Sequence, residues 1–336
     1  MLRDILKGES QDISGTADVI AHVAPDVVLL VGFDFDLNGV ALAAFAETVA
    51  GRGQSYPYRH AWPSNRGRAS FQDLDQDGYL GDPEDAHGYG LFAGQGSMAL
   101  LSRFPLDPDA GQDWHRFLWG DLPGAIPPDD AARDDRLAST GFWEVPVRPP
   151  NGPSFHVLAW HASPPVFDGP EDRNGRRNHD EAAFWLSRLD GRVGTPIKEL
   201  FVLLGDSNLD TADGDGRPGA MSDLLSHPAL LDPQPTSAGG IEAAERELGA
   251  NLRHTGDPAL DTVNWPDDGT WPGNLRVDYV LPSAGWDVVG SGVFWPERGD
   301  PLRALIGDEG DRASRHHLVW VDLVPSSAAQ GDVDGR

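Results

Sequence analysis

Phe201-Val-Leu-Leu204 is followed directly by Gly205-Asp206-Ser207-Asn208, and this stretch is the clearest indication of the fold. A short run of apolar residues followed at once by glycine predicts a buried strand that leaves the sheet through a tight turn. The aspartate can align a water molecule or carry a proton, and the asparagine amide can donate to an oxygen on which charge builds. An Asp/Asn pair is also a common turn sequence, so the tetrapeptide alone leaves both interpretations open.

Apolar runs of the same kind recur on both sides of this stretch and alternate with helical segments. Helices are predicted over residues 10–24, 41–50 and 180–189, whereas residues 51–90 and 105–141 are expected to be irregular. Val- and Leu-rich strands separated by helices and long loops predict an α/β fold of mixed sheets with helices outside. The further strands are expected at Asp26–Val31, Ser97–Leu101, Phe155–Trp160, Arg276–Leu281 and Leu318–Leu323.

His161, Asp206 and Asn208 stand at or just after strand ends and His316 stands beside a strand start, where active sites often lie. Asp278 sits between apolar residues of one strand, and burying a carboxylate is costly unless it is paired. We expect its partner to be His316, because a carboxylate on one imidazole nitrogen fixes the tautomer and favours the imidazolium form. His161 ends another strand and could donate to a phosphate oxygen. Each histidine taken alone is more often a core residue with satisfied hydrogen bonds.

The order of these motifs resembles the endonuclease/exonuclease/phosphatase superfamily. A strand ending in His, a strand ending in GDxN, an R-V-D-Y-V-L strand and a late Ser-x-His follow one another from about residue 17 to 324. Residues 165–181 and 274–282 are similar to a poorly characterised bacterial branch of it. The resemblance implies a single DNase-like domain over residues 1–324, built as a four-layer α/β/β/α sandwich, with a flexible tail at 325–336.

The resemblance also implies hydrolysis of a phosphate monoester or diester. In that case His316 is the general base or the donor that stabilises the transition state, with Asp278 orienting it. Asp206 positions the attacking water or protonates the leaving group. Asn208 and His161 bind the non-bridging phosphate oxygens. In-line attack on phosphorus needs a positioned water and charge-stabilising donors, which agrees with these roles.

The chain departs from the family pattern where that pattern places its divalent metal. Gly32 stands where family members carry the Glu that holds Mg²⁺ or Mn²⁺, and the first strand with its metal-site Asn has no counterpart before residue 17. The late motif is Ser-Arg-His instead of Ser-Asp-His, with Arg315 at its centre. Asp34 could replace the missing ligand, Arg315 could supply positive charge directly, or the chain could be a silent member that binds a ligand or partner.

A separate acidic stretch between residues 73 and 84 matches a twelve-residue calcium loop, with Gly78 at the sharp turn. The absence of clear flanking helices predicts a structural Ca²⁺ clip rather than a sensor; the alternative is an acidic turn in solvent. The ligands would be Asp73, Asp75, Asp77, the Tyr79 carbonyl and Glu84. If the strand-end motifs were chance matches, the chain would be a calcium-stabilised α/β protein without this activity.

Positive charge is concentrated at residues 172–179, where Arg173 and Arg177 could grip a substrate phosphate. An alternative of equal weight is a solvated loop whose arginines pair with nearby acidic side chains.

The overall charge limits the class of substrate. With 53 acidic and 26 basic residues the formal charge is -27, which disfavours charge-driven binding of long nucleic acid and favours a small phosphorylated substrate. There is no Cys, which excludes disulfides and thiolate chemistry. No apolar run is long enough to span a membrane, and we expect neither a membrane anchor nor a signal peptide in the residues given. A monomer is expected, and no compartment is assigned.

Overall fold

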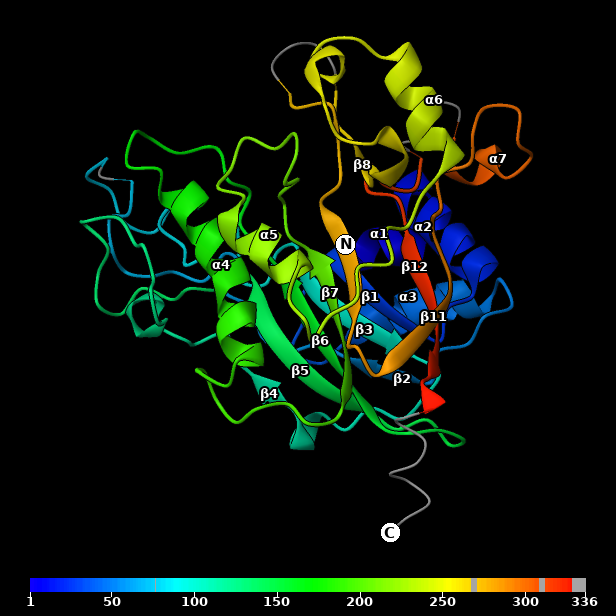
Figure 1. Cartoon of the computed structure of the whole chain (residues 1–336), viewed down its shortest axis with the longest axis horizontal. Coiled ribbons are helices and arrows are strands. Elements are labelled where there is room, and N and C mark those ends of the chain that lie inside the picture. Colours follow the sequence, from blue (N-terminus) through cyan, green and yellow to red (C-terminus); the bar gives the residue numbers. More distant parts are fainter. Residues whose placement is uncertain (76, 267–270, 308–311, 328–336) are drawn as a thin grey trace.

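The computed structural model describes residues 1–75, 77–266, 271–307 and 312–327. Two sheets pack face to face with helices on their outer sides, as the α/β sandwich prediction required (Figure 1). Residues 328–336 of the predicted tail lie outside the described residues. Among the described residues, no helix combines the length and apolar composition needed to cross a bilayer.

The first sheet has the strand order β1-β3-β2, and its strands are antiparallel. Side chains alternate between its faces, as expected for pleated strands. In β3, Ala99 and Leu101 pack toward the helices, whereas Met98 and Leu100 pack against the second sheet. The elements of this half are α1 (Leu2–Lys7), α2 (Gln11–Val23), β1 (Val27–Phe33), α3 (Val40–Ala50), β2 (Tyr58–His60) and β3 (Ser97–Ser102).

The second sheet has the order β10-β7-β6-β5-β4, in which only the β6–β7 pair is parallel among the described strands. The outer face of this sheet is covered by α4 and α5, where Phe184 and Trp185 pack on Phe142. Its elements are β4 (Gln112–Asp113), β5 (Gly141–Val147), β6 (Phe155–His161), α4 (Arg173–Leu189), β7 (Leu200–Asp206), α5 (Gly219–Leu225) and β10 (Asp278–Pro282).

Of the remaining elements, α6, β8 and α7 gather at one end of the molecule, whereas β11 and β12 run alongside the sheets (Figure 1). A large cavity is lined in part by β12. β11 (Trp286–Val293) and β12 (Val319–Pro325) form a separate antiparallel pair. A cavity of about 1400 Å³ is lined by residues of β1, β12, α2, β7 and β10. The smaller elements are α6 (Ala238–Arg246), β8 (Val263–Asn264), β9 (Asn274–Leu275) and α7 (Arg303–Ile306).

Two sequence predictions are corrected by the structure, and both errors come from polar residues that are buried. No strand was predicted over β5, which begins at Gly141 where the segment expected to be irregular ends; its Glu144 is unusual in a core strand and is tolerated because Arg188 pairs with it at 2.5 Å. Helix α4 begins at Arg173, not at Asp180. Its first turns look like a loop because Gly175 and polar residues dominate them, but several of those polar side chains are buried in hydrogen bonds.

Candidate functional site

Three of the predicted residues form one row across neighbouring strands. In the parallel β6–β7 pair, His161 lies opposite Asp206, and in the antiparallel β7–β10 pair, Asp206 lies opposite Asp278. His161 Nε2 and Asp206 Oδ2 are 3.6 Å apart. All three side chains line the large cavity. Strand register therefore brings together residues that are more than a hundred positions apart in the sequence.

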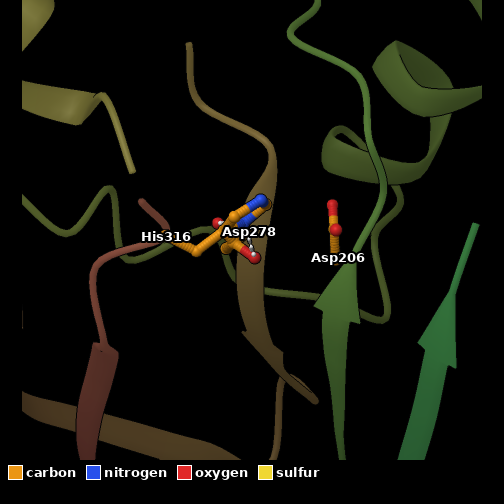
Figure 2. Close-up of side chains that lie close together, drawn as sticks. All are labelled: Asp206, Asp278 and His316. Carbon is orange, nitrogen blue, oxygen red and sulfur yellow. Dashed lines mark hydrogen bonds and ion pairs between the residues drawn. The ribbon is translucent and has the colours of Figure 1, made fainter. Parts of the chain in front are cut away.

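His316 joins this row from the loop before β12 (Figure 2). A bridge to Val263 fixes its backbone, and its Nδ1 lies 2.9 Å from Asp278 Oδ2. Asp278 Oδ2 also accepts from the Thr262 hydroxyl at 2.9 Å, so the carboxylate is held from both sides. The predicted pairing of Asp278 with His316 is present, and Trp265 packs edge-on against the imidazole with 5.3 Å between the ring centroids.

Burial and neighbouring charges set different protonation states along the row. Burial alone would lower the pKa of His316, but the charges of Asp278 and Asp206 and the hydrogen bond to Asp278 raise it to about 9. Burial, followed by the charge of Asp278, raises the pKa of Asp206 to about 7. Burial, with Arg66 and His316 adding to it, holds the pKa of His161 well below its usual value. At neutral pH His316 is thus an imidazolium, Asp206 is a carboxyl group that titrates, and His161 is a neutral imidazole.

Asn208 lies beside the row and holds Asp206 in place. Its backbone is in the left-handed region, with φ of 52°, and its N–H donates to Asp206 Oδ1 at 2.7 Å. The side-chain amide donates to the Ala162 carbonyl at 2.9 Å and to Asp206 Oδ2 at 3.2 Å. Both amide hydrogens are therefore used within the protein, so Asn208, which also lines the cavity, holds Asp206 in place with donors that are already engaged.

The family comparison covers nearly the whole chain. The Endonuclease/Exonuclease/phosphatase family matches residues 6–316. The chain belongs to this family. The endonucleases, exonucleases and phosphatases in its name are hydrolases of phosphate esters.

Solved structures that the chain resembles include bacterial proteins. An endonuclease/exonuclease/phosphatase from Beutenbergia cavernae is 20% identical, with a TM-score of 0.56 over 94% of this chain and 67% of that one. A family protein from Leptotrichia buccalis is 16% identical, with a TM-score of 0.51 over 94% of this chain and 93% of that one. A mannosyl-6-phosphatase from Bacteroides thetaiotaomicron is 14% identical, with a TM-score of 0.49 over 96% and 94%. No curated protein sequence matches the chain.

Two residues of α4, which the sequence analysis did not assign to the site, support it from behind. Asn178 Nδ2 donates to the carbonyls of Ser163 and Ser207, each at 2.7 Å, and so ties together the loops that follow β6 and β7. The Glu181 carboxylate accepts from the backbone N–H of Ser139 and of Ser163, each at 2.6 Å. Both residues lie in the segment 165–181, and the resemblance of that segment to a family branch could have pointed to them.

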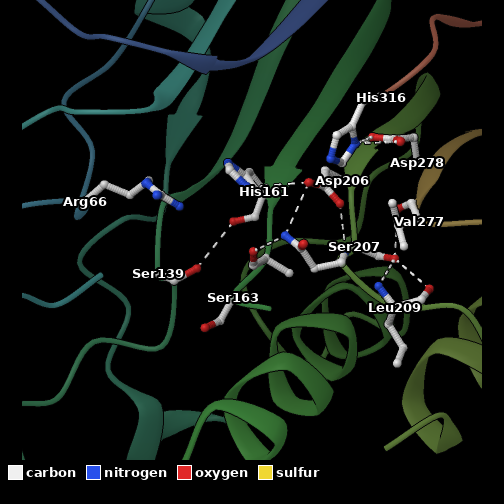
Figure 3. Close-up of polar contacts among 12 residues, drawn as sticks. Arg66, Ser139, His161, Ser163, Asp206, Ser207, Leu209, Val277, Asp278 and His316 are labelled. Carbon is white, nitrogen blue, oxygen red and sulfur yellow. Dashed lines mark hydrogen bonds and ion pairs between the residues drawn. The ribbon is translucent and has the colours of Figure 1, made fainter. Parts of the chain in front are cut away.

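Arg66 is a third residue of the site, and no sequence motif pointed to it. It lines the cavity with His161, Asp206 and His316, and its guanidinium end is directed toward His161 (Figure 3). It lies in the segment between β2 and β3, far in sequence from every motif of the row.

The arginines that were predicted to bind substrate lie elsewhere. Arg173 is paired with Asp130 at 3.1 Å and with Asp135 at 3.2 Å. Arg177 is buried, its Nη1 donates to the His87 carbonyl at 2.9 Å, and it does not line the described cavity. These contacts give both side chains a structural explanation.

Arg315 and Asp34 also have contacts that turn them away from the row. Arg315 is exposed and its Nη1 donates to the Asn264 carbonyl at 3.3 Å. Asp34 Oδ1 accepts from the Gly96 N–H at 2.9 Å, and neither side chain lines the described cavity. Gly32 does line it, and a Cβ built there would meet no atom within 4 Å.

Possible metal-ligand atoms cluster in two places in the described part of the chain. Ligand atoms of Asp206, Asp278 and His316 lie within 4.8 Å of one another. In the acidic loop, the same holds for Asp73, Asp75 and Asp85 and for Asp75, Asp77 and Asp82. Asp85 and Asp82, rather than Glu84, thus join the predicted calcium ligands in these groups, while residue 76 lies outside the described residues.

At the row, the donors fit Mg²⁺ or Mn²⁺ poorly. Both oxygens of Asp206 accept from Asn208, and both oxygens of Asp278 lie within 3.2 Å of His316 Nδ1. Mg²⁺ requires nearly ideal octahedral oxygen coordination, and Gly32 contributes no side chain.

Proposed function

We propose that the chain hydrolyses a phosphate ester at the row formed by His161, Asp206, Asp278 and His316. The observation that carries this proposal is the convergence of an imidazolium–carboxylate pair and a separate titrating carboxyl group on one cavity. Such a set can both move a proton and stabilise negative charge, which are the two requirements of in-line attack on phosphorus.

In the proposed reaction, Asp206 accepts the proton of the attacking water, and His316 stabilises the negative charge on the phosphoryl group. Ionised Asp206 accepts a proton from the attacking water as the bond from the water oxygen to phosphorus forms. The bond from phosphorus to the leaving ester oxygen breaks on the opposite side of phosphorus, that oxygen takes a proton from solvent, and Asp206 releases its own proton to solvent. Because its pKa is raised to about 9, His316 serves as a hydrogen-bond donor to a phosphoryl oxygen rather than as a general base.

The substrate is proposed to be small. The formal charge of -27 opposes the approach of a long polyanion, whereas one phosphoryl group can be neutralised locally. The second candidate function is ligand or partner binding by a catalytically silent family member. The absence of a side chain at Gly32 favours that alternative.

The test is hydrolysis of bis-nitrophenyl phosphate and nitrophenyl phosphate by the purified protein, with Mg²⁺, Mn²⁺, Ca²⁺ or chelator. We expect turnover in the wild type, and a loss of about a hundredfold or more in His316→Ala and in Asp206→Ala. Turnover that both variants retain would remove these residues from the mechanism. Absence of turnover with every metal and with chelator would support the silent alternative.

We also propose that the acidic loop from Asp73 to Asp85 binds a structural Ca²⁺. Support comes from its clustered carboxylate oxygens, since Ca²⁺ prefers oxygen ligands in flexible arrangements. This site is proposed independently of the phosphoesterase activity.

A further inference from the structure

We infer that Arg66 anchors the phosphoryl anion in this site and supplies the fixed positive charge that a divalent cation would otherwise provide. This inference rests on the proposed phosphoesterase function and names the group that binds the substrate's phosphate.

The position of Arg66 is set by its backbone and by the base of its side chain. Its N–H donates to Ser64 Oγ at 3.0 Å, and its carbonyl accepts from the Gly94 N–H at 2.8 Å. Nε donates to the Gln95 carbonyl at 3.3 Å, and a Cβ added to Gly96 would lie 3.3 Å from the same nitrogen. Packing against a glycine thus leaves room for the guanidinium, which points toward His161 (Figure 3), and both residues line the cavity.

The guanidinium of Arg66 has no ion-pair partner in the part of the chain that the structure describes, although the protein contains twice as many acidic as basic residues. A partly buried charge without a counter-ion is costly and calls for an anionic ligand. Asp206 and Glu181 attract it only from beyond ion-pair distance. Four other arginines with little exposure are paired instead: Arg52 with Asp18, Arg173 with Asp130, Arg188 with Glu144 and Arg276 with Asp232. The buried Arg177 has no ion pair in the described structure either, but its terminal Nη1 donates to the His87 carbonyl, whereas the guanidinium of Arg66 donates there only through Nε.

The charge and shape of the guanidinium suit the ligand that the row requires. Its planar set of N–H donors matches two oxygens of a phosphoryl group, which a compact ammonium cannot do. His316 approaches the same cavity from the side of β12, so an anion between the two cations would lie within reach of Asp206. Two observations therefore point to an anion that binds without a metal ion: the row fits Mg²⁺ poorly, and the guanidinium of Arg66 has no ion-pair partner in the described structure.

The experiment measures binding of inorganic phosphate by calorimetry in excess EDTA, with Arg66→Gln, Arg66→Lys and Arg68→Gln. Arg68 belongs to the same segment and donates from Nε to the Ser64 carbonyl, but it does not line the cavity, so Arg68→Gln is the matched control. We expect the wild type and Arg68→Gln to bind within twofold of one another. Binding should weaken at least tenfold in Arg66→Gln. It should weaken by a smaller factor in Arg66→Lys, which keeps the positive charge but cannot donate two parallel N–H hydrogen bonds to the phosphate. Equal circular dichroism spectra and thermal midpoints identify folded variants, and Arg66→Lys carries the test if Arg66→Gln does not fold.

Two outcomes would overturn the inference: unchanged phosphate affinity in folded Arg66 variants, or binding that disappears in EDTA and returns with Mg²⁺. The hydrolysis assay separates this failure from that of the proposed function. If the Arg66 variants match the wild type while His316→Ala loses turnover, the inference fails and the phosphoesterase stands. If neither turnover nor an effect of His316→Ala is seen, the proposed function itself fails.

Discussion

The row at the strand ends and the acidic loop at residues 73–85 use similar carboxylates in opposite ways. In the loop, the exposed carboxylates accept from nearby backbone: Gly78 N–H donates to Asp73 and Tyr79 N–H to Asp77, at 3.1 and 2.8 Å. In the row, Asp278 is held by Thr262 and His316, which come from other parts of the chain. The loop is thus a local structure that water can reach, whereas the row is a tertiary structure whose charges interact strongly because water is largely excluded.

The largest expected effect is on catalysis. Asp278→Asn removes the charge that raises the pKa of His316, so the imidazolium is lost at a lower pH. We expect a hundred- to ten-thousandfold loss of turnover. In the wild type, turnover should rise with pH through about 7 as Asp206 ionises and fall through about 9 as His316 loses its proton. Measuring turnover from pH 5 to 10 should show that the alkaline limb moves to lower pH in Asp278→Asn.

The matched control for that measurement is Asp287→Asn, the same change on exposed β11 surface. An alkaline limb in Asp278→Asn that coincides with that of the wild type would show that His316 does not govern it.

An intermediate effect is expected on stability, because the site also buries Glu181. Burial raises the pKa of Glu181 from 4.5 to about 7, so between these values the folded protein binds more protons than the unfolded chain. Its contribution should therefore lower the free energy of unfolding as pH rises from 4.5 to 7, by on the order of 2–3 kcal/mol. Asp206 and Asp261, with pKa values raised to about 7 and about 8 mainly by burial, should add in the same direction.

Urea unfolding at several pH values between 4.5 and 8 checks this prediction. Glu181→Gln should reduce the slope of unfolding free energy against pH, whatever its effect on absolute stability. Glu84→Gln, the same change in the exposed loop, should leave the slope as in the wild type. Equal slopes in all three proteins would contradict the proton linkage.

The smallest expected effect concerns the loop itself. The double variant Asp73→Asn, Asp77→Asn should weaken Ca²⁺ binding at least tenfold, because both carboxylates lie in the clustered groups. Calorimetric titration with Ca²⁺ measures this, with Asp129→Asn as an exposed acidic control outside the loop. The hydrolysis rate should not change, because the loop does not line the cavity. Equal heats for the double variant and the wild type would exclude this loop as the calcium site.

The sequence by itself determined the fold class, most of the strands and four members of the row. Apolar runs predicted β1, β3, β6, β7 and β12 to within two residues at each end, because strand pattern is a local property of side-chain burial. The pairing of Asp278 with His316 also followed from local reasoning, since a carboxylate among apolar residues needs a partner.

Only the tertiary structure decided which charges face the cavity. Arg173, Arg177 and Arg315 resemble Arg66 in sequence chemistry, yet each has an internal contact that Arg66 lacks at its terminal nitrogens in the described structure. Strand β5 was not predicted for a similar reason: its buried Glu144 is paired with Arg188, which lies on another element. The physical reason is that the free energy of a buried charge depends on neighbours brought together by folding, which no short stretch of sequence specifies.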